Sequence, residues 1–499
     1  MMETENDNAL PRGWVRTTVG DISETINPGF PSGKHNKENR GVPHLRPMNI
    51  SPHGEIDLSD VKSVEVDKYE PLKVGDVLFN NTNSPVWVGK TAVIKQDSGW
   101  AYSNHMTRIR PINQAIDSTW LSMVLHYFFV IGFFRANCTH HVNQASINSH
   151  FLSKRVSFPL PPLPEQHRIV AKIEELLTRL DAGVKALNAV KAQLKRYRQS
   201  VLRCAFDGKL TAEWRVAHKG KLEPASVLLE RIKEERKEQL GNKYKELPPV
   251  DASELPELPE GWGWASVFHT AESMKNGIYR PPHFYGEQGT ACLRMYNIEK
   301  GFLVWKDIKR MNLDDEEIHE YQLLPDDILV NRVNSRELVG KAAVFPSGLE
   351  TCVYESKNIR LRLQRRFVES KFVNFWFLIY SQRYFNRNAQ QTVGMASINQ
   401  EQLGAMPIPL LSITEQQQIV SEIERHFSVA DVIERSVDQS ITQSERLRQS
   451  ILKKAFEGKL VPQDPSDEPA ERLLERIRAD RKNENTKSNQ ESMRGQTLN

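Results

Sequence analysis

Two stretches of the chain carry residue types that could act on a phosphate group. The glycine-rich segment Gly29–His35 could cradle phosphate oxygens with its backbone amides, as a phosphate-binding loop does. The carboxylates of Asp326 and Glu355, followed by Lys357, could hold Mg²⁺ for phosphodiester cleavage, in the order that PD-(D/E)xK nucleases use. Either site would make the chain an enzyme.

Neither stretch has the complete pattern that its chemistry requires. Gly29 and Gly33 have too few residues between them, and His35 stands where Ser or Thr should bind Mg²⁺. In the first half of the chain, the equivalent residues are Gly75-Asp76 and Ser103-Asn104-His105, which cannot hold a metal in the same way. A turn followed by a surface strand explains the second pattern with fewer assumptions, because such short motifs have many false positives.

Other candidates for catalysis are also incomplete. Asn27–Phe30 lacks the second proline of the Asn-Pro-Pro-aromatic motif of amino-methyltransferases, and no glycine-rich cofactor loop follows a strand elsewhere. His140, His141 and His150 have no cysteine or carboxylate at ligand spacing, so we interpret them as surface or core histidines. Since no nucleophile, base and orienting group stand together, we predict no catalytic, cofactor or metal site in this chain.

The composition is that of a soluble protein with several domains. The 499 residues include 39% hydrophobic and 26% charged residues, which is ordinary for soluble proteins. The longest apolar stretch, Leu121–Phe134, contains His126 and Gly132, which favours a buried helix over a membrane span. The scattered cysteines and the lack of a signal-peptide pattern predict a cytoplasmic protein. A net charge of +4 permits nucleic-acid binding without requiring it.

The elements that would position any site come in two copies. Ala-Ser-Ile-Asn at 145–148 returns at 396–399, and Ala-Phe-Asp-Gly-Lys-Leu at 205–210 returns as Ala-Phe-Glu-Gly-Lys-Leu at 455–460. The period of about 250 residues is far above the roughly 20–50 residues of solenoid repeats, so whole domains have been duplicated. A chain with two like halves can contact two like features of a partner at a fixed separation.

Each half begins with a mixed α/β part. Short apolar runs bounded by Gly, Pro, Asn and Asp predict strands and turns, and a helix is expected near 119–134 and again near 370–383. The two parts match at scaffold positions, such as Leu10–Trp14 with Leu258–Trp262, whereas His35–Arg40 has no good counterpart. Recognition loops that diverged on a shared scaffold would give this contrast, and so would the drift of unconstrained loops.

Each half ends in a long helix. From Ile169 and again from Ile419, apolar residues recur every three or four positions, close to a heptad pattern. Each helix of roughly 40 residues would be about 60 Å long, and Gly208 and Gly458 are the expected C-caps. Pairing the two helices would bury both apolar stripes. The alternative is that each helix packs on its own mixed part.

The repeated segments resemble those of one known family. The run Pro-Leu-Pro-Pro-Leu-Pro-Glu-Gln at 159–166 enters one long helix, the Gly-Lys-Leu segments close both helices, and Met395–Asn399 closes a mixed part. Together they resemble the specificity subunit of type I restriction-modification systems, HsdS. Each motif alone is weak evidence, but the combination is specific and covers the chain up to about residue 480.

The resemblance implies a DNA-binding subunit without catalytic activity of its own. Each mixed part would be a target recognition domain that reads one half of a bipartite double-stranded DNA site. The two long helices would set the spacing and dock two methyltransferase subunits, which supply S-adenosylmethionine, and ATP- and Mg-dependent restriction subunits would join. The alternatives are a stand-alone nuclease or DNA methyltransferase with duplicated recognition domains, and a purely structural coiled-coil scaffold.

The predicted fold class is α/β (α+β), with two mixed domains separated by a pair of long antiparallel coiled-coil helices. Two heads related by a pseudo-two-fold axis should meet half-sites of opposite orientation about 34–36 Å apart, and because the heads differ, the whole site should not be a palindrome. The expected boundaries are 1–160 for the first recognition domain, 161–250 for its helical region and linker, 251–408 for the second domain, 409–480 for its helical region, and 481–499 for a disordered tail.

Polar and basic loop residues are the natural DNA readers, since Arg and Lys suit guanine and Asn and Gln suit adenine. In the first head we predict contacts from Asn81, Asn83, Ser84, Lys90, Asn143 and Gln144. In the second head we predict contacts from Arg332, Asn334, Ser335, Arg336 and Lys341. Some of these would touch only phosphate. A basic run on the first long helix could face DNA, a partner or solvent: Lys191, Lys195, Arg196, Arg198 and Arg203.

Overall fold

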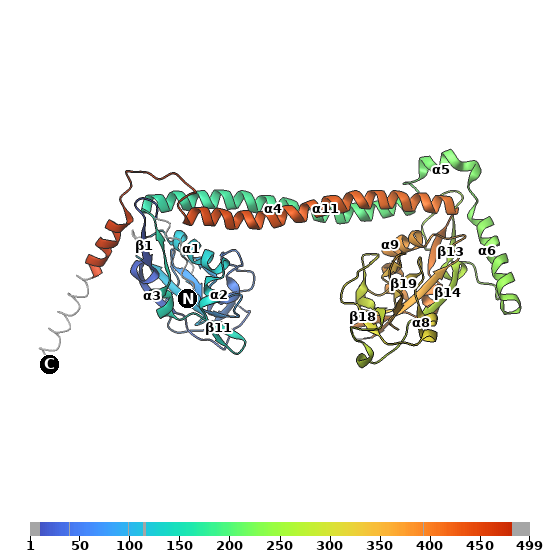
Figure 1. Ribbon diagram of the computed structural model, residues 1–499, viewed down its shortest axis with the longest axis horizontal. Coiled ribbons are helices and arrows are strands. Elements are labelled where there is room, and N and C mark those ends of the chain that lie inside the picture. Colours follow the sequence, from blue (N-terminus) through green and yellow to red (C-terminus); the bar gives the residue numbers. More distant parts are fainter. Residues whose placement is uncertain (1–9, 39, 98, 113–115, 393, 482–499) are drawn as a thin grey trace. The chain divides into compact units, whose positions relative to one another are not determined.

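The computed structural model describes residues 10–38, 40–97, 99–112, 116–392 and 394–481. It divides into two units, Met1–Leu187 with Asp438–Asn499 and Asn188–Val437. Each unit contains one mixed α/β head and part of both long helices (Figure 1). The division therefore passes through the long helices and does not separate the two sequence repeats. The tail predicted to be disordered lies, from residue 482 onward, outside the described residues.

The first head is built on a four-stranded antiparallel sheet in the order β2-β9-β5-β7. Its strands are β2 (Ser23–Pro28), β5 (Val77–Asn80), β7 (Thr91–Val93) and β9 (Met106–Pro111). Two smaller sheets adjoin it in the orders β4-β3-β8 and β10-β11-β6. These contain β3 (Val42–Leu45), β4 (Lys62–Val64), β6 (Thr82–Asn83), β8 (Ala101–Tyr102), β10 (Thr139–His141) and β11 (Gln144–Ser146).

The second head repeats this topology strand for strand. Its sheets have the orders β14-β23-β19-β21, β18-β15-β22 and β20-β25-β24. The strands are β14 (Ala271–Asn276), β15 (Thr290–Leu293), β18 (Lys309–Met311), β19 (Ile328–Asn331), β20 (Val333–Asn334), β21 (Ala342–Val344), β22 (Cys352–Tyr354), β23 (Asn358–Leu363), β24 (Gln390–Thr392) and β25 (Met395–Ser397). An additional hairpin joins β16 (Ile298–Glu299) to β17 (Phe302–Leu303).

A two-stranded sheet closes each head where it meets its long helix. In the first head β1 (Val15–Thr18) pairs antiparallel with β12 (Ser157–Leu160). In the second head β13 (Gly263–Ser266) pairs with β26 (Pro407–Leu410) in the same way. The beginning and the end of each head therefore lie together, immediately before the helix starts.

Helices cover the sheets. The stretch predicted as one helix near 119–134 is broken at Gly132, whose φ of 80° is left-handed, into α1 (Ser118–Val130) and α2 (Phe133–Asn137). The stretch predicted near 370–383 is the single helix α9 (Ser370–Asn388). The other helices of the heads are α3 (Ser149–Arg155), α7 (Val267–Thr270), α8 (Asp315–Tyr321) and α10 (Gln400–Gly404).

The two long helices have equal length. The first is α4 (Leu163–Phe206) and the second is α11 (Ile413–Phe456), with 44 residues each. Both end as predicted at a glycine with φ of 69°, Gly208 and Gly458, whose amides bond to carbonyls of the last helical turn. Among the described residues, no helix combines the length and the apolar character that crossing a bilayer requires.

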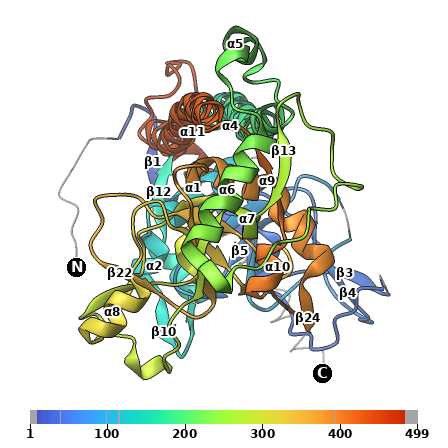
Figure 2. The same ribbon diagram turned by 90° about the vertical axis from the view of Figure 1, so that its right-hand side faces the viewer.

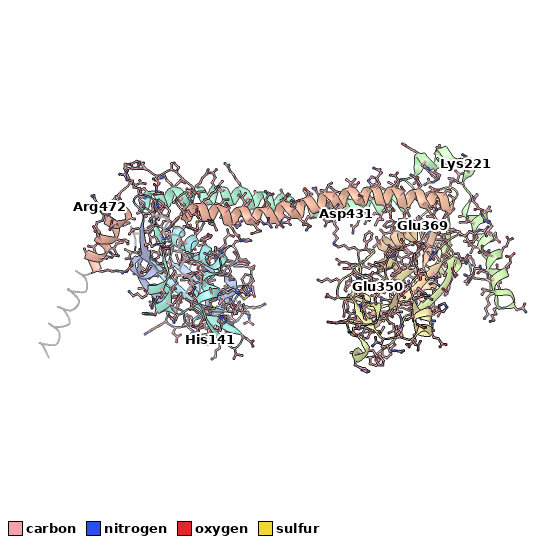
Figure 3. The ribbon with its side chains drawn as sticks, viewed as in Figure 1. His141, Lys221, Glu350, Glu369, Asp431 and Arg472 are labelled. Atoms are coloured by element: carbon pink, nitrogen blue, oxygen red, sulfur yellow. The ribbon has the colours of Figure 1, made fainter. Side chains whose placement is uncertain are left out.

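The helices pair with each other and also pack on the heads. In the first unit Arg448 of α11 forms an ion pair with Asp181 of α4. In the second unit Arg198 of α4 contacts Asp431 and Glu434 of α11, at 2.5 and 2.8 Å. Figures 1 and 2 show the helices side by side, and Figure 3 marks Asp431 on α11. Near the heads, residues such as Ile173 join the head core. The helices therefore pair with each other in some parts and pack on the heads in others, so both alternatives considered from the sequence hold.

Each head is completed by segments of the other repeat. In the first unit Trp120 of α1 packs on Phe456 with ring centroids 5.0 Å apart, and in the second unit Trp376 of α9 packs on Phe206 at 5.1 Å. The short helix α6 (Ala225–Leu240), which follows α5 (Ala212–His218), buries Leu228 in the second head. The helical segment 470–481 likewise buries Leu474 in the first head.

Candidate functional site

A turn between β8 and β9 holds three loops of the first head together. The Ser103 amide donates to the Leu45 carbonyl at 2.9 Å, and the Asn104 amide donates to the Phe30 carbonyl at 3.2 Å. The His105 carbonyl accepts from the amide of Asn81 at 3.1 Å. The loops that follow β2, β3 and β5 therefore meet at this turn. We call these three loops and the turn Ser103–His105 the turn surface of the first head.

The second head has the same arrangement around Glu355–Lys357, between β22 and β23. The amides of Glu355 and Ser356 donate to the carbonyls of Leu293 at 3.0 Å and Ile278 at 2.9 Å. The Lys357 carbonyl accepts from the Arg332 amide at 2.8 Å. The same three contacts thus form at equivalent positions, and this region is the turn surface of the second head. The turn residues that are at least partly exposed differ, since Asn104 and Ser356 occupy one position and His105 and Lys357 the next.

A glycine in each turn surface explains the false phosphate-loop motif. A Cβ atom on Gly29 would lie 2.0 Å from the Tyr102 carbonyl oxygen, and one on Gly277 would lie 2.3 Å from the Tyr354 oxygen. Only glycine allows the loop to approach the strand this closely. The segment after Gly29 leads to strand β3 and, in its described residues, opens no helix, so the helix N-terminus of a phosphate-binding loop is not found there.

Three of the predicted DNA-contacting residues are buried and hold the turn surfaces in place. The Asn81 amide donates to the Thr107 hydroxyl at 2.9 Å, and the Asn334 amide donates to the Asn331 side chain at 2.8 Å. Lys90 donates to the carbonyl of Ile50, and burial lowers its pKa. Since each side chain is at most 7% exposed, we correct the expectation that they present a free edge to DNA. Their role is to support the neighbouring loops.

The predicted residues beside them lie at the rim. Asn83 and Ser335 are half-buried, as are Ser84, Arg332 and Lys341. The Asn83 side chain accepts from the Ser84 amide at 2.8 Å, which shapes the loop. The Arg332 guanidinium donates to the carbonyls of Ser356 and Ile398, both at 3.3 Å. These groups are partly engaged in the loops that they border, and burial lowers the pKa of Lys341.

Asn143, Gln144 and Arg336 are exposed. Asn143 has a left-handed φ of 62° and forms the tip of the β10–β11 hairpin. The hairpin adjoins the turn surface because Ala145 pairs with Asn83 across β11 and β6. His141, on the same hairpin, lies on the side of the first head that faces away from α4 (Figure 3). The structure therefore brings the predicted hairpin residues next to the predicted loop residues.

The basic run on α4 is divided between two environments. Arg198 is engaged in pairing with α11 through Asp431 and Glu434. Lys195, Arg196 and Arg203 are exposed, and Lys191 is partly buried. Only part of the run is therefore available to DNA or to a partner.

Sequence reasoning missed exposed side chains on the turn surfaces. Tyr279 and Tyr296 of the second head are 74% and 66% exposed, and Met48 of the first head is 52% exposed. The sequence contained a signal for Met48 and Tyr296. The segments Leu45-Arg46 and Asn49-Ile50 repeat as Leu293-Arg294 and Asn297-Ile298 and form a matched frame, and the two residues inside that frame differ.

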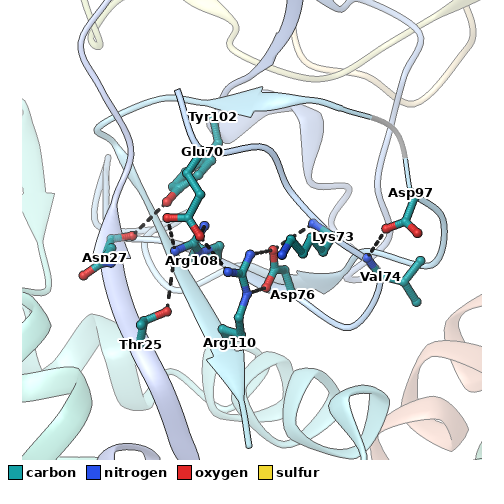
Figure 4. Close-up of polar contacts among 10 residues, drawn as sticks. All are labelled: Thr25, Asn27, Glu70, Lys73, Val74, Asp76, Asp97, Tyr102, Arg108 and Arg110. Atoms are coloured by element: carbon teal, nitrogen blue, oxygen red, sulfur yellow. Dashed lines mark hydrogen bonds and ion pairs between the residues drawn. The ribbon is translucent and has the colours of Figure 1, made fainter. Parts of the chain in front are cut away.

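A charged cluster stiffens the sheet that carries each turn surface. In the first head Arg110 makes two hydrogen bonds of 2.8 Å to Asp76, while Glu70 contacts both Arg110 and the buried Arg108 (Figure 4). The Arg108 hydrogen bond lowers the pKa of Glu70. The second head repeats the arginine–aspartate pair, and backbone carbonyls that accept from Arg360 take the place of Glu70.

The residues of the nuclease pattern do not lie together in the folded structure. Strand β19 separates its two carboxylates, because Asp326 precedes the end that pairs with Leu361 and Glu355 lies near the end that pairs with Asn358. Asp326 is 3.4 Å from Arg365, and Glu355 accepts the amide of Met295 at 2.7 Å. Within the described part of the chain, no three histidine, cysteine or acidic residues form a group that could hold a metal.

A repeated Glu-Gln pair joins each head to its long helix. Glu165 accepts from the Trp14 indole at 3.0 Å, and Glu415 accepts from the Trp262 indole at 3.1 Å. Glu415 also accepts from Thr211 and Arg215, at 2.9 and 2.7 Å. The next residues, Gln166 and Gln416, bond to the backbone before α1 and α9. The repeated Glu-Gln motif thus fixes the angle between head and helix.

Comparison with known proteins gives a consistent picture. The family model "Type I restriction modification DNA specificity domain" matches residues 11–196. The type I restriction enzyme StySPI specificity subunit of Salmonella potsdam is 27% identical over 501 residues, 95% of this chain and 97% of that relative. The EcoKI specificity subunit of Escherichia coli strain K12 is 27% identical over 498 residues, 95% of this chain and 96% of that relative.

A solved structure described as showing complex assembly and conformational transition of the type I R-M system shares the fold. It has a TM-score of 0.61 at 18% identity, over 90% of this chain and 99% of that one. These findings confirm the resemblance and the fold class that the repeated segments predicted. Over nearly its whole length the chain is similar to the specificity subunits of type I restriction-modification systems, the HsdS family.

Proposed function

We propose that this chain is the DNA-specificity subunit of a type I restriction-modification complex and reads an asymmetric, bipartite DNA site with one half-site for each head. The observation that carries the proposal is the pair of turn surfaces. Their backbone contacts are the same in both heads, whereas their exposed side chains differ. Loops of different chemistry on one rigid scaffold are suited to reading two different sequences.

The DNA contacts that we propose come from the accessible residues of the predicted set. They are Asn83, Ser84, Asn143 and Gln144 in the first head, and Arg332, Ser335, Arg336 and Lys341 in the second. Amide and guanidinium groups can pair with adenine and guanine edges in the major groove, and the hydroxyl groups suit either base edges or phosphate. The buried Asn81, Lys90 and Asn334 keep a supporting role.

The partners that we propose are two methyltransferase subunits and restriction subunits. The close repetition of the helical segments supports this stoichiometry, because two like surfaces suit two copies of one partner. S-adenosylmethionine, ATP and Mg²⁺ would act in those partners, in the cytoplasm, and this chain would have no catalytic role. The incomplete motifs described above support the last point.

An exchange of heads tests the proposal. Replacing Leu10–Leu160 with the head of another family member, in the complex with methyltransferase subunits, should change one half of the recognised site and leave the other half unchanged. Methylation mapping on a randomised DNA library measures both halves at once. A change in both halves would show that the heads do not read independently. Cleavage or methyl transfer by the purified chain alone would favour the stand-alone enzyme.

A further inference from the structure

We propose that Tyr296 of the second head and Met48 of the first head are specificity-determining residues, each of which contacts a base of its half-site. The proposal rests on the proposed function and assigns it to two positions outside the sequence-predicted set. Both residues lie in short 3₁₀ turns, Pro47–Asn49 and Met295–Asn297, at equivalent places after β3 and β15.

A buried asparagine fixes each turn in the same conformation. The Asn49 side chain accepts from the Arg46 amide, and the Asn297 side chain accepts from the Arg294 amide, both at 2.9 Å. The other side of each asparagine donates to backbone carbonyls of the following loop, at 2.9 Å for Asp57 and for Lys306. Since the two asparagines are 2% and 1% exposed, each turn is held by a buried, hydrogen-bonded side chain.

The residue before that asparagine therefore projects from a rigid backbone. Met48 is 52% exposed and Tyr296 is 66% exposed, although large apolar side chains usually gain free energy from burial. Because the backbone of each turn is already ordered, binding a ligand there costs only the ordering of the side chain itself. The internal repeat thus keeps the frame and changes the two residues within it, of which Met48 and Tyr296 are the exposed ones.

Tyr296 borders the turn surface of the second head. The amide of its neighbour Met295 donates to the Glu355 carboxylate at 2.7 Å, and Glu355 begins the turn at the centre of that surface. On the other side of the turn, Tyr279 follows Ile278, which bridges to the same glutamate. Two exposed tyrosines therefore flank Glu355–Lys357, close to the residues proposed to contact DNA.

The surrounding charge favours DNA as the partner of this surface. The Arg294 guanidinium lies 5.5 Å from the centre of the Tyr296 ring, and Lys357 is exposed in the turn that begins at Glu355. Glu355, the acidic residue of the turn itself, is buried and already accepts a backbone amide. Cations around an aromatic ring provide phosphate contacts beside a group that can contact a base.

The two side chains predict different kinds of recognition. The Tyr296 hydroxyl can donate or accept a hydrogen bond at a base edge. Met48 offers only an apolar surface and a weak acceptor, which suits the methyl group of thymine. We therefore expect the two half-sites to differ in base preference at the position that each residue contacts.

Competition binding with the complex of this chain and its methyltransferase subunits tests the proposal. The DNA panel contains the cognate site, every single-base variant of it, and non-specific duplex. Tyr296→Phe and Tyr296→Met should each weaken cognate binding on the order of 10-fold and relax the preference at one base of the second half-site. Non-specific binding and its salt dependence should stay unchanged. Met48→Tyr should alter one base of the first half-site only.

Phe302→Ala is the matched control, because Phe302 is 55% exposed in the same head but lies in the β16–β17 hairpin. It should leave cognate binding unchanged. An equal loss on cognate and non-specific DNA would overturn the proposal in favour of a phosphate contact. Weaker methyltransferase association with unchanged base preferences would overturn it in favour of a protein contact, and no change at all would leave Tyr296 without a role in recognition. If the wild-type complex itself showed no sequence preference, the proposed function would fail first.

Discussion

The junctions between heads and helices predict unequal effects of the same mutation at two equivalent glutamates. Glu415 is 2% exposed and its carboxylate accepts three hydrogen bonds, from Trp262, Thr211 and Arg215. Glu165 is 1% exposed, and among the described residues its Oε1 atom has no hydrogen-bond partner. We expect Glu415→Gln to destabilise the protein strongly and Glu165→Gln to have little effect.

The expected loss of stability depends on the charge that each substitution leaves unpaired. Removing one partner of a buried ion pair costs about 3–5 kcal/mol. Arg215 keeps a bond of 2.7 Å to the Gly208 carbonyl and lies 5.2 Å from the centre of the Trp262 ring. We therefore expect the lower end, about 3 kcal/mol, for Glu415→Gln. A glutamine that replaces Glu165 can still accept from Trp14, so we expect a change of about 1 kcal/mol or less.

Glu165→Gln should also change how the free energy of unfolding depends on pH. Burial raises the pKa of Glu165 above its usual 4.5, against the opposing effects of Trp14 and Arg168. The folded chain therefore holds this proton more tightly than the unfolded chain does. The contribution of the carboxyl group to stability is complete below pH 4.5 and is lost as the pH rises through the raised value. Relative to wild type, the Glu165→Gln variant should become more stable as the pH rises.

Urea unfolding of wild type and both variants at neutral pH measures the free energies of unfolding. Hydrogen exchange in peptides that contain Trp14 or Trp262 then assigns any loss to one unit. Equal destabilisation by the two substitutions, or a larger effect at Glu165, would refute the reasoning, because it would mean that the hydrogen bonds counted at Glu415 do not set the energy of the junction.

Two further predictions concern spacing and acid stability. Removing one heptad from α4 and the facing heptad from α11 shortens the helix pair by about 10 Å. Methylation mapping should then show a preferred spacer that is shorter by roughly three base pairs. An unchanged spacer would contradict a role of the helices in spacing. Burial lowers the pKa of both His44 and His126 to about 4, so the first head should lose stability as the pH falls from 6.5 toward 4. Urea unfolding across this range should show the loss, and His44→Gln should reduce it; an equal slope in the variant would assign the loss to other groups.

The sequence predicted the features that depend on neighbours in the chain. The helix ends at Gly208 and Gly458 and the periodicity from Ile169 are local signals, and the structure has them where expected. Burial of Asn81 and Lys90 depends on contacts with Thr107 and Ile50, which only the folded sheet brings near. The sequence alone therefore could not show which polar residues at strand ends are accessible to DNA and which are buried and support the loops.

Completion of each head by the other repeat could not be predicted either. The motif Ala-Phe-Asp/Glu-Gly-Lys-Leu is kept in both copies, but its partner is the Leu-Pro start of the opposite copy. A Cβ atom on Gly208 would lie 2.3 Å from Pro259, and one on Gly458 would lie 2.5 Å from Pro11. Periodicity shows that a face is buried and does not show which segment buries it.

This exchange of segments imposes an order on synthesis of the chain. The second unit, Asn188–Val437, is continuous, so all of its parts have left the ribosome before the chain is finished. The first head is made first, yet it waits for Ile451, Leu452 and Leu474, which are made last. At about 5–20 residues per second the wait is on the order of tens of seconds. Protease sensitivity of nascent chains stalled before residue 438 would measure it. The part of the protein that is translated earliest is thus the last to become stable, and throughout that interval it exposes apolar surface that chaperones can bind.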